Sequence, residues 1–152
     1  MYFMWLTDDE QRVWRAYLAM SAGLQATLGR QLQAESGLSL ADYDVLVALD
    51  EAVNCRVNEL GERLGWEQSR LSHQLRRMRS RGLIVRHGAD DDRRGARVEL
   101  TATGASALAA AAPGHAELVR RLVFDGTGEA ELRTIEAWAR AVLDRLALEE
   151  PR

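Results

Sequence analysis

Residues 57–100 read VNELGERLGWEQSRLSHQLRRMRSRGLIVRHGADDDRRGARVEL, and they contain the patterns most informative about the fold. The first half of this stretch carries two apolar faces with the spacing of an α-helix. They are Val57, Leu60 and Leu64 on the first segment, and Leu71, Leu75 and Met78 on the second. Gly65 and Gly82 follow the two segments, as glycine often does at helix ends because it adopts left-handed backbone without strain. The stretch therefore predicts two short consecutive helices separated by a tight turn.

The second half of the stretch predicts a pair of strands. Residues 83–88, LIVRHG, are short and β-branched, and residues 96–100, ARVEL, alternate apolar with polar side chains. The charged, turn-rich residues between them favour a two-stranded hairpin. A helix, a turn, a second helix and a hairpin are the order of a winged helix-turn-helix, in which the second helix enters the major groove of DNA.

Helices are also predicted on both sides of this core. They cover residues 8–35, 40–51, 102–124 and 129–148. Gly37 ends the first of these helices, Ser39 or Asp42 can cap the second, and Thr101 can cap the third. The third helix should bend or break at Pro113 and then resume, because proline cannot donate a helical hydrogen bond. The predicted fold class is mainly α with a small β-hairpin wing.

Charge is divided unevenly along the chain. The 152 residues have a formal net charge of −3. Between residues 56 and 97, eleven arginines stand against six acidic residues, so this segment has a net charge of +5 while the rest of the chain is acidic. A basic middle in an acidic body is the pattern expected of a DNA-reading lobe on a solubilising scaffold.

The second helix of the core has two different faces. At about 100° per residue its apolar residues cluster on one side, and polar and basic side chains lie on the other. Arginine can pair with guanine, and serine hydroxyls can bond to bases or phosphates. We therefore predict DNA contacts from Gln68, Ser69, Arg70, Ser72, His73, Arg76 and Arg77. A solvated basic face without a ligand is the alternative interpretation.

The hairpin tip supplies a second set of basic residues. Arg93, Arg94 and Arg97 lie where a wing would follow the DNA backbone into the neighbouring minor groove. Asp92 is predicted to hold the wing arginines in place by bidentate pairing. A metal site at residues 90–92 is the competing interpretation. Adjacent loop carboxylates without further ligands are usually a solvated turn, so no metal is predicted.

Three segments, taken in order, resemble one known family. They are LSLADYDVLVAL at 38–49, VNELGERLGWEQSRLSHQLRRMRSRGLIVR at 57–86 and DDDRRGARVELTATG at 90–104. The last contains an Asp-Arg-Arg-Gly element followed by a Leu-Thr-x-x-Gly element. Together they look like the core of the MarR (multiple antibiotic resistance regulator) family. The resemblance implies a single domain over 1–152, with a winged helix-turn-helix lobe at 36–100 and a helical dimerisation region at 1–35 and 101–152.

The resemblance also implies a homodimer that binds a pseudo-palindromic operator in double-stranded DNA, with repression as the favoured role. Its two recognition helices would contact half-sites about one helical turn, roughly 34 Å, apart. Apolar stripes near the C-terminus agree with a dimer, although packing within the chain would explain part of them. The predicted dimerisation residues are Leu118, Leu122, Phe124, Leu132, Ile135, Trp138, Val142 and Leu146.

Many MarR-like proteins release DNA when a small aromatic or anionic molecule binds, so the resemblance implies an effector as well. The first two helices supply apolar residues and one cationic anchor that would suit such a pocket. They are Trp14, Tyr17, Tyr43, Leu46 and Arg15. Ordinary core packing is the alternative for each of them, because aromatic residues at helical spacing usually pack.

Other classes of function are disfavoured. The single Cys55 cannot form an internal disulfide and is too few for a zinc site, and an inert thiol is favoured over a redox sensor. The three histidines are scattered, so no enzyme activity and no cofactor are predicted. Neither a membrane-spanning apolar run nor a signal peptide is found, so a cytoplasmic protein is expected. A winged-helix module that contacts proteins without specific DNA binding is the alternative function.

Overall fold

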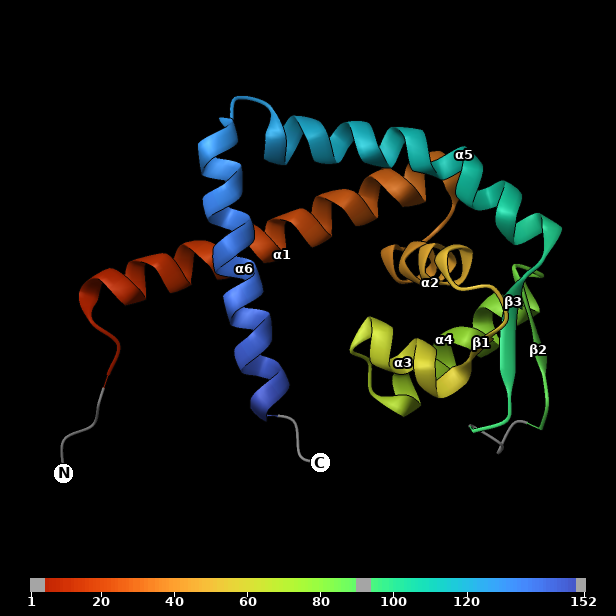
Figure 1. Cartoon of the computed structure of the whole chain (residues 1–152). Helices are drawn as coiled ribbons and strands as arrows, with labels where there is room; N and C mark the ends of the chain where they lie inside the picture. Colours follow the sequence, from red (N-terminus) through yellow and green to blue (C-terminus); the bar gives the residue numbers. More distant parts are fainter. Residues whose placement is uncertain (1–4, 90–93, 150–152) are drawn as a thin grey trace. The chain divides into compact units, whose positions relative to one another are not determined.

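The structure is a computed structural model that describes residues 5–89 and 94–149 (Figure 1). In chain order its elements are α1 (Asp8–Ser36), α2 (Leu40–Glu51), β1 (Cys55–Arg56), α3 (Val57–Leu64), α4 (Gln68–Ser80), β2 (Ile84–His87), β3 (Arg97–Leu100), α5 (Ala102–Val119), a π-helical turn (Arg120–Phe124) and α6 (Glu129–Glu149). The chain divides into two compact units, one up to His115 and the other from Ala116. The single domain expected from the sequence stays a prediction.

Local hydrogen bonds explain where the first helices begin and end. The Ser39 hydroxyl accepts a bond from the Asp42 amide at 3.0 Å, and the Asp42 carboxylate accepts one from the Ser39 amide at 2.9 Å. This reciprocal capping box starts α2. Gly37, with φ 69°, ends α1 in the left-handed conformation that glycine adopts without strain. The predicted bounds of both helices are confirmed to within one residue.

Among the described residues the sheet has three strands, not the predicted two. Residues Cys55 and Arg56 form β1, which pairs antiparallel with β3, so the strand order is β1-β3-β2. The sequence prediction missed β1 because two residues are too short to show an alternating pattern. The pairing places the turn before α3 directly on the wing, since Cys55 lies opposite Val98.

Of the bend or break predicted at Pro113, the break is wrong, and the bend stays a prediction. The α-helical pattern of α5 continues through Pro113 to Val119, and a π-helical turn then follows over Arg120–Phe124. Four alanines precede the proline at 109–112, and alanine has the highest helix propensity. We attribute the continuity to these residues, which offset the single hydrogen bond that proline cannot donate.

The core of the first unit forms around α2, which packs against α1, α3, α4 and β3. Its largest fully buried side chains include Leu32, Leu46, Leu60, Leu71, Met78 and Ile84. Burying a leucine of this kind contributes roughly 1.5–3 kcal/mol. Because Leu71, Leu75 and Met78 of α4 point into this core, the opposite face of α4 is turned to solvent.

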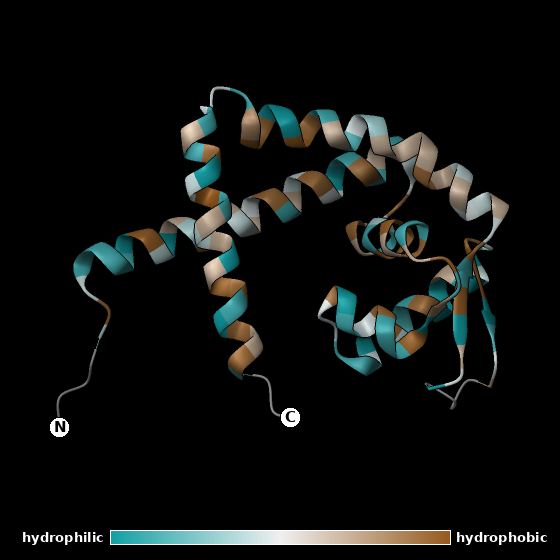
Figure 2. Cartoon of the chain, viewed as in Figure 1, coloured by the Kyte–Doolittle hydropathy of each residue, from teal (hydrophilic) through white to brown (hydrophobic). Residues whose placement is uncertain are grey.

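The second unit leaves much of its apolar surface exposed. Figure 2 shows hydrophobic and hydrophilic residues alternating along α6, and none of its described residues is buried. Of the predicted dimerisation residues, Leu118 is buried, Leu132 and Val142 are half-buried, and Leu122, Phe124, Ile135, Trp138 and Leu146 are exposed. Within residues 5–89 and 94–149, no helix is long and apolar enough to span a membrane.

Candidate nucleic-acid interface

The outward face of α4 carries the residues that the sequence assigned to DNA. Each of them is exposed or half-exposed: Gln68, Ser69, Arg70, Ser72, His73, Arg76 and Arg77. The two-faced helix is therefore confirmed, while the contacts of these residues with DNA stay a prediction. The face combines hydroxyl, imidazole, amide and guanidinium groups, which can both donate and accept hydrogen bonds.

The N-terminal turn of α4 has no side chain that caps its amide groups. Glu67 is the N-cap residue without a side-chain capping bond, and the first turn contains no acidic residue. The free amide groups of a helix N-terminus attract anions such as phosphate. Next to them, the Arg70 guanidinium lies 4.1 Å from the centre of the Trp66 ring. This cation–π contact favours one arrangement of the Arg70 side chain at the edge of the face.

The inner face of α4 contains a buried polar network that the sequence analysis did not predict. The Gln74 Nε2 donates to Asp42 Oδ1 at 2.6 Å, and the Arg81 Nη1 donates to Asp42 Oδ2 at 2.7 Å. Arg81 also donates to the carbonyl of Gly37 at 3.0 Å. Asp42 and Gln74 are only 3% and 2% exposed. The network therefore ties both the middle of α4 and the residue after its end to α2.

Asp42 is held in its ionised form. Burial acts to raise its pKa, but hydrogen bonds from Ser39 and the bond and positive charge of Arg81 outweigh burial and bring the pKa below its ordinary value. Ser39 and Arg81 thus stabilise the charge that burial disfavours. No single local pattern signals this network, because Asp42 and Gln74 lie 32 residues apart.

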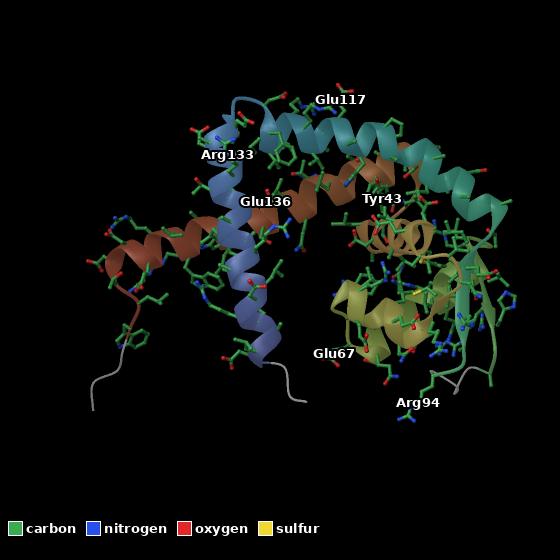
Figure 3. The ribbon with its side chains drawn as sticks, in the orientation of Figure 1. Tyr43, Glu67, Arg94, Glu117, Arg133 and Glu136 are labelled. Atoms are coloured by element: carbon green, nitrogen blue, oxygen red, sulfur yellow. The ribbon has the colours of Figure 1, made fainter. Side chains whose placement is uncertain are left out.

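Of the three arginines predicted to contact DNA from the wing, Arg94 is the one whose side chain the structure describes as exposed. Arg94 is exposed in the turn before β3, and Figure 3 shows it pointing away from the body of the unit on the same side as Glu67. Arg97 is different, because its Nη1 donates to the carbonyl of Asn54 at 2.7 Å and it is half-buried. Arg97 therefore supports the loop before β1. Arg93 and the positioning residue Asp92 lie outside the described residues, as does the candidate metal cluster at 90–92.

A hollow of about 40 Å³ lies between α4 and β2. It is lined by Ser72, Leu75, Arg76, Arg79, Ile84 and Arg86. Arg86 belongs to the site although the sequence analysis did not select it. The sequence could have indicated Arg86, because it lies two residues after Ile84 in the same strand and alternate residues of a strand share one face. Three of the six residues that line the hollow beside the outward face of α4 are therefore arginines.

The predicted effector residues fall into two separate groups. Leu46 is buried in the core, and Tyr43 packs on His115 with ring centres 4.3 Å apart. Trp14 and Tyr17 stack on each other at 5.6 Å on an exposed part of α1, next to Arg15. Tyr17 precedes the core residue Leu32 by about 22 Å of helix. The two groups lie apart along the chain, and the effector pocket stays a prediction.

Cys55 has the environment of an inert thiol. It is 3% exposed, and burial raises its pKa, with Glu59 adding to the rise and Arg63 and Arg97 opposing it. In the part of the chain that the structure describes, no three His, Cys, Asp or Glu residues cluster as metal ligands would.

Comparison with known proteins agrees with this geometry. A family model described as the MarR family matches residues 36–95. No match to a curated protein was found. Among solved structures, AbsC, a MarR family transcriptional regulator from Streptomyces coelicolor, is 33% identical with a TM-score of 0.87, covering 95% of this chain and 99% of AbsC.

A second MarR family transcriptional regulator from Streptomyces coelicolor, solved in complex with DNA, is 35% identical with a TM-score of 0.88, covering 95% of this chain and 92% of that one. The Mycobacterium tuberculosis transcriptional regulator MOSR, also solved with DNA, is 26% identical with a TM-score of 0.72, covering 90% and 97% of the two chains. Identity above 30% over nearly the full length of two regulators, together with the family match, shows that this chain belongs to the MarR family of transcriptional regulators.

Proposed function

We propose that this protein is a sequence-specific DNA-binding transcription regulator that binds a pseudo-palindromic operator as a homodimer. The observation that carries the proposal is the outward face of α4, where polar and basic side chains are exposed over a buried apolar stripe. Two relatives with the same fold were solved in complex with DNA, which supports a DNA partner here.

In this proposal α4 enters the major groove. Its 13 residues make a rod about 20 Å long, and the major groove is roughly 12 Å wide and admits a helix. Ser69, Ser72, His73 and Arg76 read base edges from the N-terminal half of the helix. Arg94 follows the backbone into the minor groove, with Arg93 beside it and Asp92 positioning them. Arg97 is left out of this set because its guanidinium holds the Asn54 carbonyl.

Phosphate groups bind at two places beside the base-reading face. One is the N-terminus of α4, where amide groups and Arg70 attract an anion. The other is the hollow between α4 and β2, where Arg79 and Arg86 lie beside Arg76. These contacts position the protein on the duplex, while the base contacts give specificity.

The dimer forms through the exposed apolar residues of the terminal helices. Ile135, Trp138 and Leu146 are 56%, 48% and 56% exposed in the single chain. Exposed apolar clusters of this kind mark protein–protein surfaces, and a second copy would cover them. Operator occupation by the dimer represses transcription, and a small aromatic or anionic effector modulates it. Trp14, Tyr17 and Arg15 on α1, with Tyr43 and Leu46 on α2, are the proposed effector contacts.

The proposal is tested by selection of fragmented genomic DNA on the purified protein. We expect enrichment of sites with two-fold symmetric halves whose centres lie about 10–10.5 base pairs apart, because two α4 helices must meet the same side of the duplex. Enrichment of no sequence would favour the alternative, a winged-helix module that uses the same surface for a protein partner.

A further inference from the structure

The hydrogen-bond chain from Asp42 through Gln74 to Arg77 has a fixed direction. The Asp42 carboxylate is buried, and its Oδ1 accepts a hydrogen bond from Gln74 Nε2 at 2.6 Å. The other end of the same amide, Gln74 Oε1, accepts from the Arg77 Nη2 at 2.5 Å. Because an ionised carboxylate can only accept, Gln74 must turn its amino group inward and its carbonyl oxygen outward. The negative charge of Asp42 therefore fixes the Gln74 amide in the orientation that offers Oε1 as an acceptor to Arg77.

We infer that Asp42 is a positioning residue for DNA recognition, which acts through Gln74 to hold the Arg77 guanidinium in its DNA-binding pose. This inference rests on the proposed function. Asp42 itself is buried on α2 and touches no DNA. Arg77 is exposed on α4, one residue after Arg76. A side chain that is already held in one pose lowers the entropy cost of binding, because it need not be immobilised when the protein meets DNA.

The other contacts of Asp42 make this direction hard to reverse. Arg81 and the Ser39 amide both donate to Oδ2, so that oxygen must remain an acceptor. An asparagine at position 42 would keep its single oxygen for these two donors and turn its amino group toward Gln74. The Gln74 amide would then flip, and its amino group would face the Arg77 guanidinium. Asp42→Asn therefore inverts the chain of hydrogen bonds with almost no change in shape.

A double-mutant cycle on operator affinity tests the inference in the full-length protein. Asp42→Asn is expected to weaken binding to the selected operator about tenfold, and to weaken it no further when Arg77 is already alanine. Gln74→Met keeps the Asp42–Arg81 pair and is expected to give the same result. If the fold-losses of operator affinity in Asp42→Asn and Arg77→Ala multiply in the double variant, the inference is overturned. Asp42 would then act on stability alone.

Ser39→Ala is the matched control for lost stability. It removes the cap hydrogen bond to the Asp42 amide but leaves the carboxylate, Gln74 and Arg77 in place. We expect a lower melting temperature with unchanged operator affinity. An equal loss of affinity in Ser39→Ala would show that any weakening of α2 has this effect, which would contradict a specific role for the carboxylate.

A measurement without DNA separates this inference from the proposed function. In nitrogen-15 spectra of the free protein, the Arg77 Nε–Hε and Gln74 amino signals are expected to show restricted motion, and the Arg77 signal to become mobile in Asp42→Asn. An Arg77 signal that is the same in both proteins would refute the positioning role even if the protein binds its operator. A positioned Arg77 in a protein that prefers no DNA sequence would refute the proposed function, and with it the role of this hydrogen-bond chain in DNA recognition, while the link from Asp42 to Arg77 would stand.

Discussion

Gly104, in the first turn of α5, lies so close to the Leu83 carbonyl oxygen that a Cβ at this position would be 2.0 Å from it. The contact sits beside Thr101, whose hydroxyl donates to the Gly82 carbonyl at 2.6 Å and accepts from the Gly104 amide at 3.0 Å. The Leu-Thr-x-x-Gly element thus joins α5 to the segment between α4 and β2. Only glycine fits there, since the opposing atom is backbone and cannot move aside.

Gly104→Ala is therefore expected to destabilise the protein although alanine favours helix elsewhere. We expect a loss of at least about 2 kcal/mol in the free energy of unfolding, in the range of an overpacked site. Urea denaturation of the variant measures it. Gly23→Ala in α1, where an added Cβ has open space, is the control and should be neutral or stabilising. A Gly104→Ala protein as stable as the wild type would contradict the close contact.

The stability of the protein should depend on the charge of Asp42. Its pKa in the folded state is below the ordinary value of about 3.9. Its contribution is therefore fully present above that value and is lost as the pH falls through the lower folded-state pKa. We expect Asp42→Asn to be less stable than the wild type at pH 7, with the difference shrinking below about pH 4. Urea denaturation between pH 7 and pH 3 tests this, and a constant difference would argue against it.

Arg76→Ala and Arg94→Ala should each weaken operator binding while leaving folding intact. Loss of one base or groove contact is expected to cost about 1–3 kcal/mol of binding free energy. Both side chains are exposed, so the melting temperature should stay nearly the same. Arg133→Ala removes the same charge from α6 and is the control. Unaltered binding in both α4 and wing variants would remove the site assignment.

Cys55 should react slowly with thiol reagents in the native protein. It is buried and its pKa is raised, so little thiolate is present near neutral pH. We expect labelling with a thiol-specific reagent to become fast only in denaturant. Rapid native labelling, or loss of operator binding on mild peroxide treatment, would instead indicate a redox sensor.

Charge introduced into the apolar face of α6 should separate the dimer. Ile135→Glu places a carboxylate where the proposed interface excludes water, so sedimentation should report a monomer. Arg133→Glu lies about 200° around the same helix and should leave the dimer intact. A wild-type protein that sediments as a monomer at micromolar concentration would contradict the homodimer directly.

Elements set by neighbouring residues were predictable from the sequence. The capping residues around α2, the apolar stripe of α4 and the glycines after α1, α3 and α4 gave helix bounds close to those observed. The exposure of the α4 face followed from the same periodicity, because a stripe that enters the core leaves the opposite side outside.

Features that depend on distant residues were not predictable. The two-residue strand β1 exists only because β3 offers it a partner 41 residues later. Asp42 looked like a capping residue alone, and its bond to Gln74 depends on how α2 packs on α4. Arg97 was expected at the wing surface, but the pairing of β1 with β3 brings it to the Asn54 carbonyl.

Sequence-specific binding by α4 is best measured by fluorescence anisotropy of labelled DNA from upstream of the protein's own gene, titrated with protein at two salt concentrations beside an unrelated duplex. We expect much tighter binding to the upstream DNA, and a steep loss of affinity as salt rises because arginines displace counterions from phosphates. Arg76→Ala should reduce the preference between the two duplexes. If the wild-type protein binds the upstream DNA, a genome-selected site and the unrelated duplex equally well, this result would contradict sequence-specific recognition by α4.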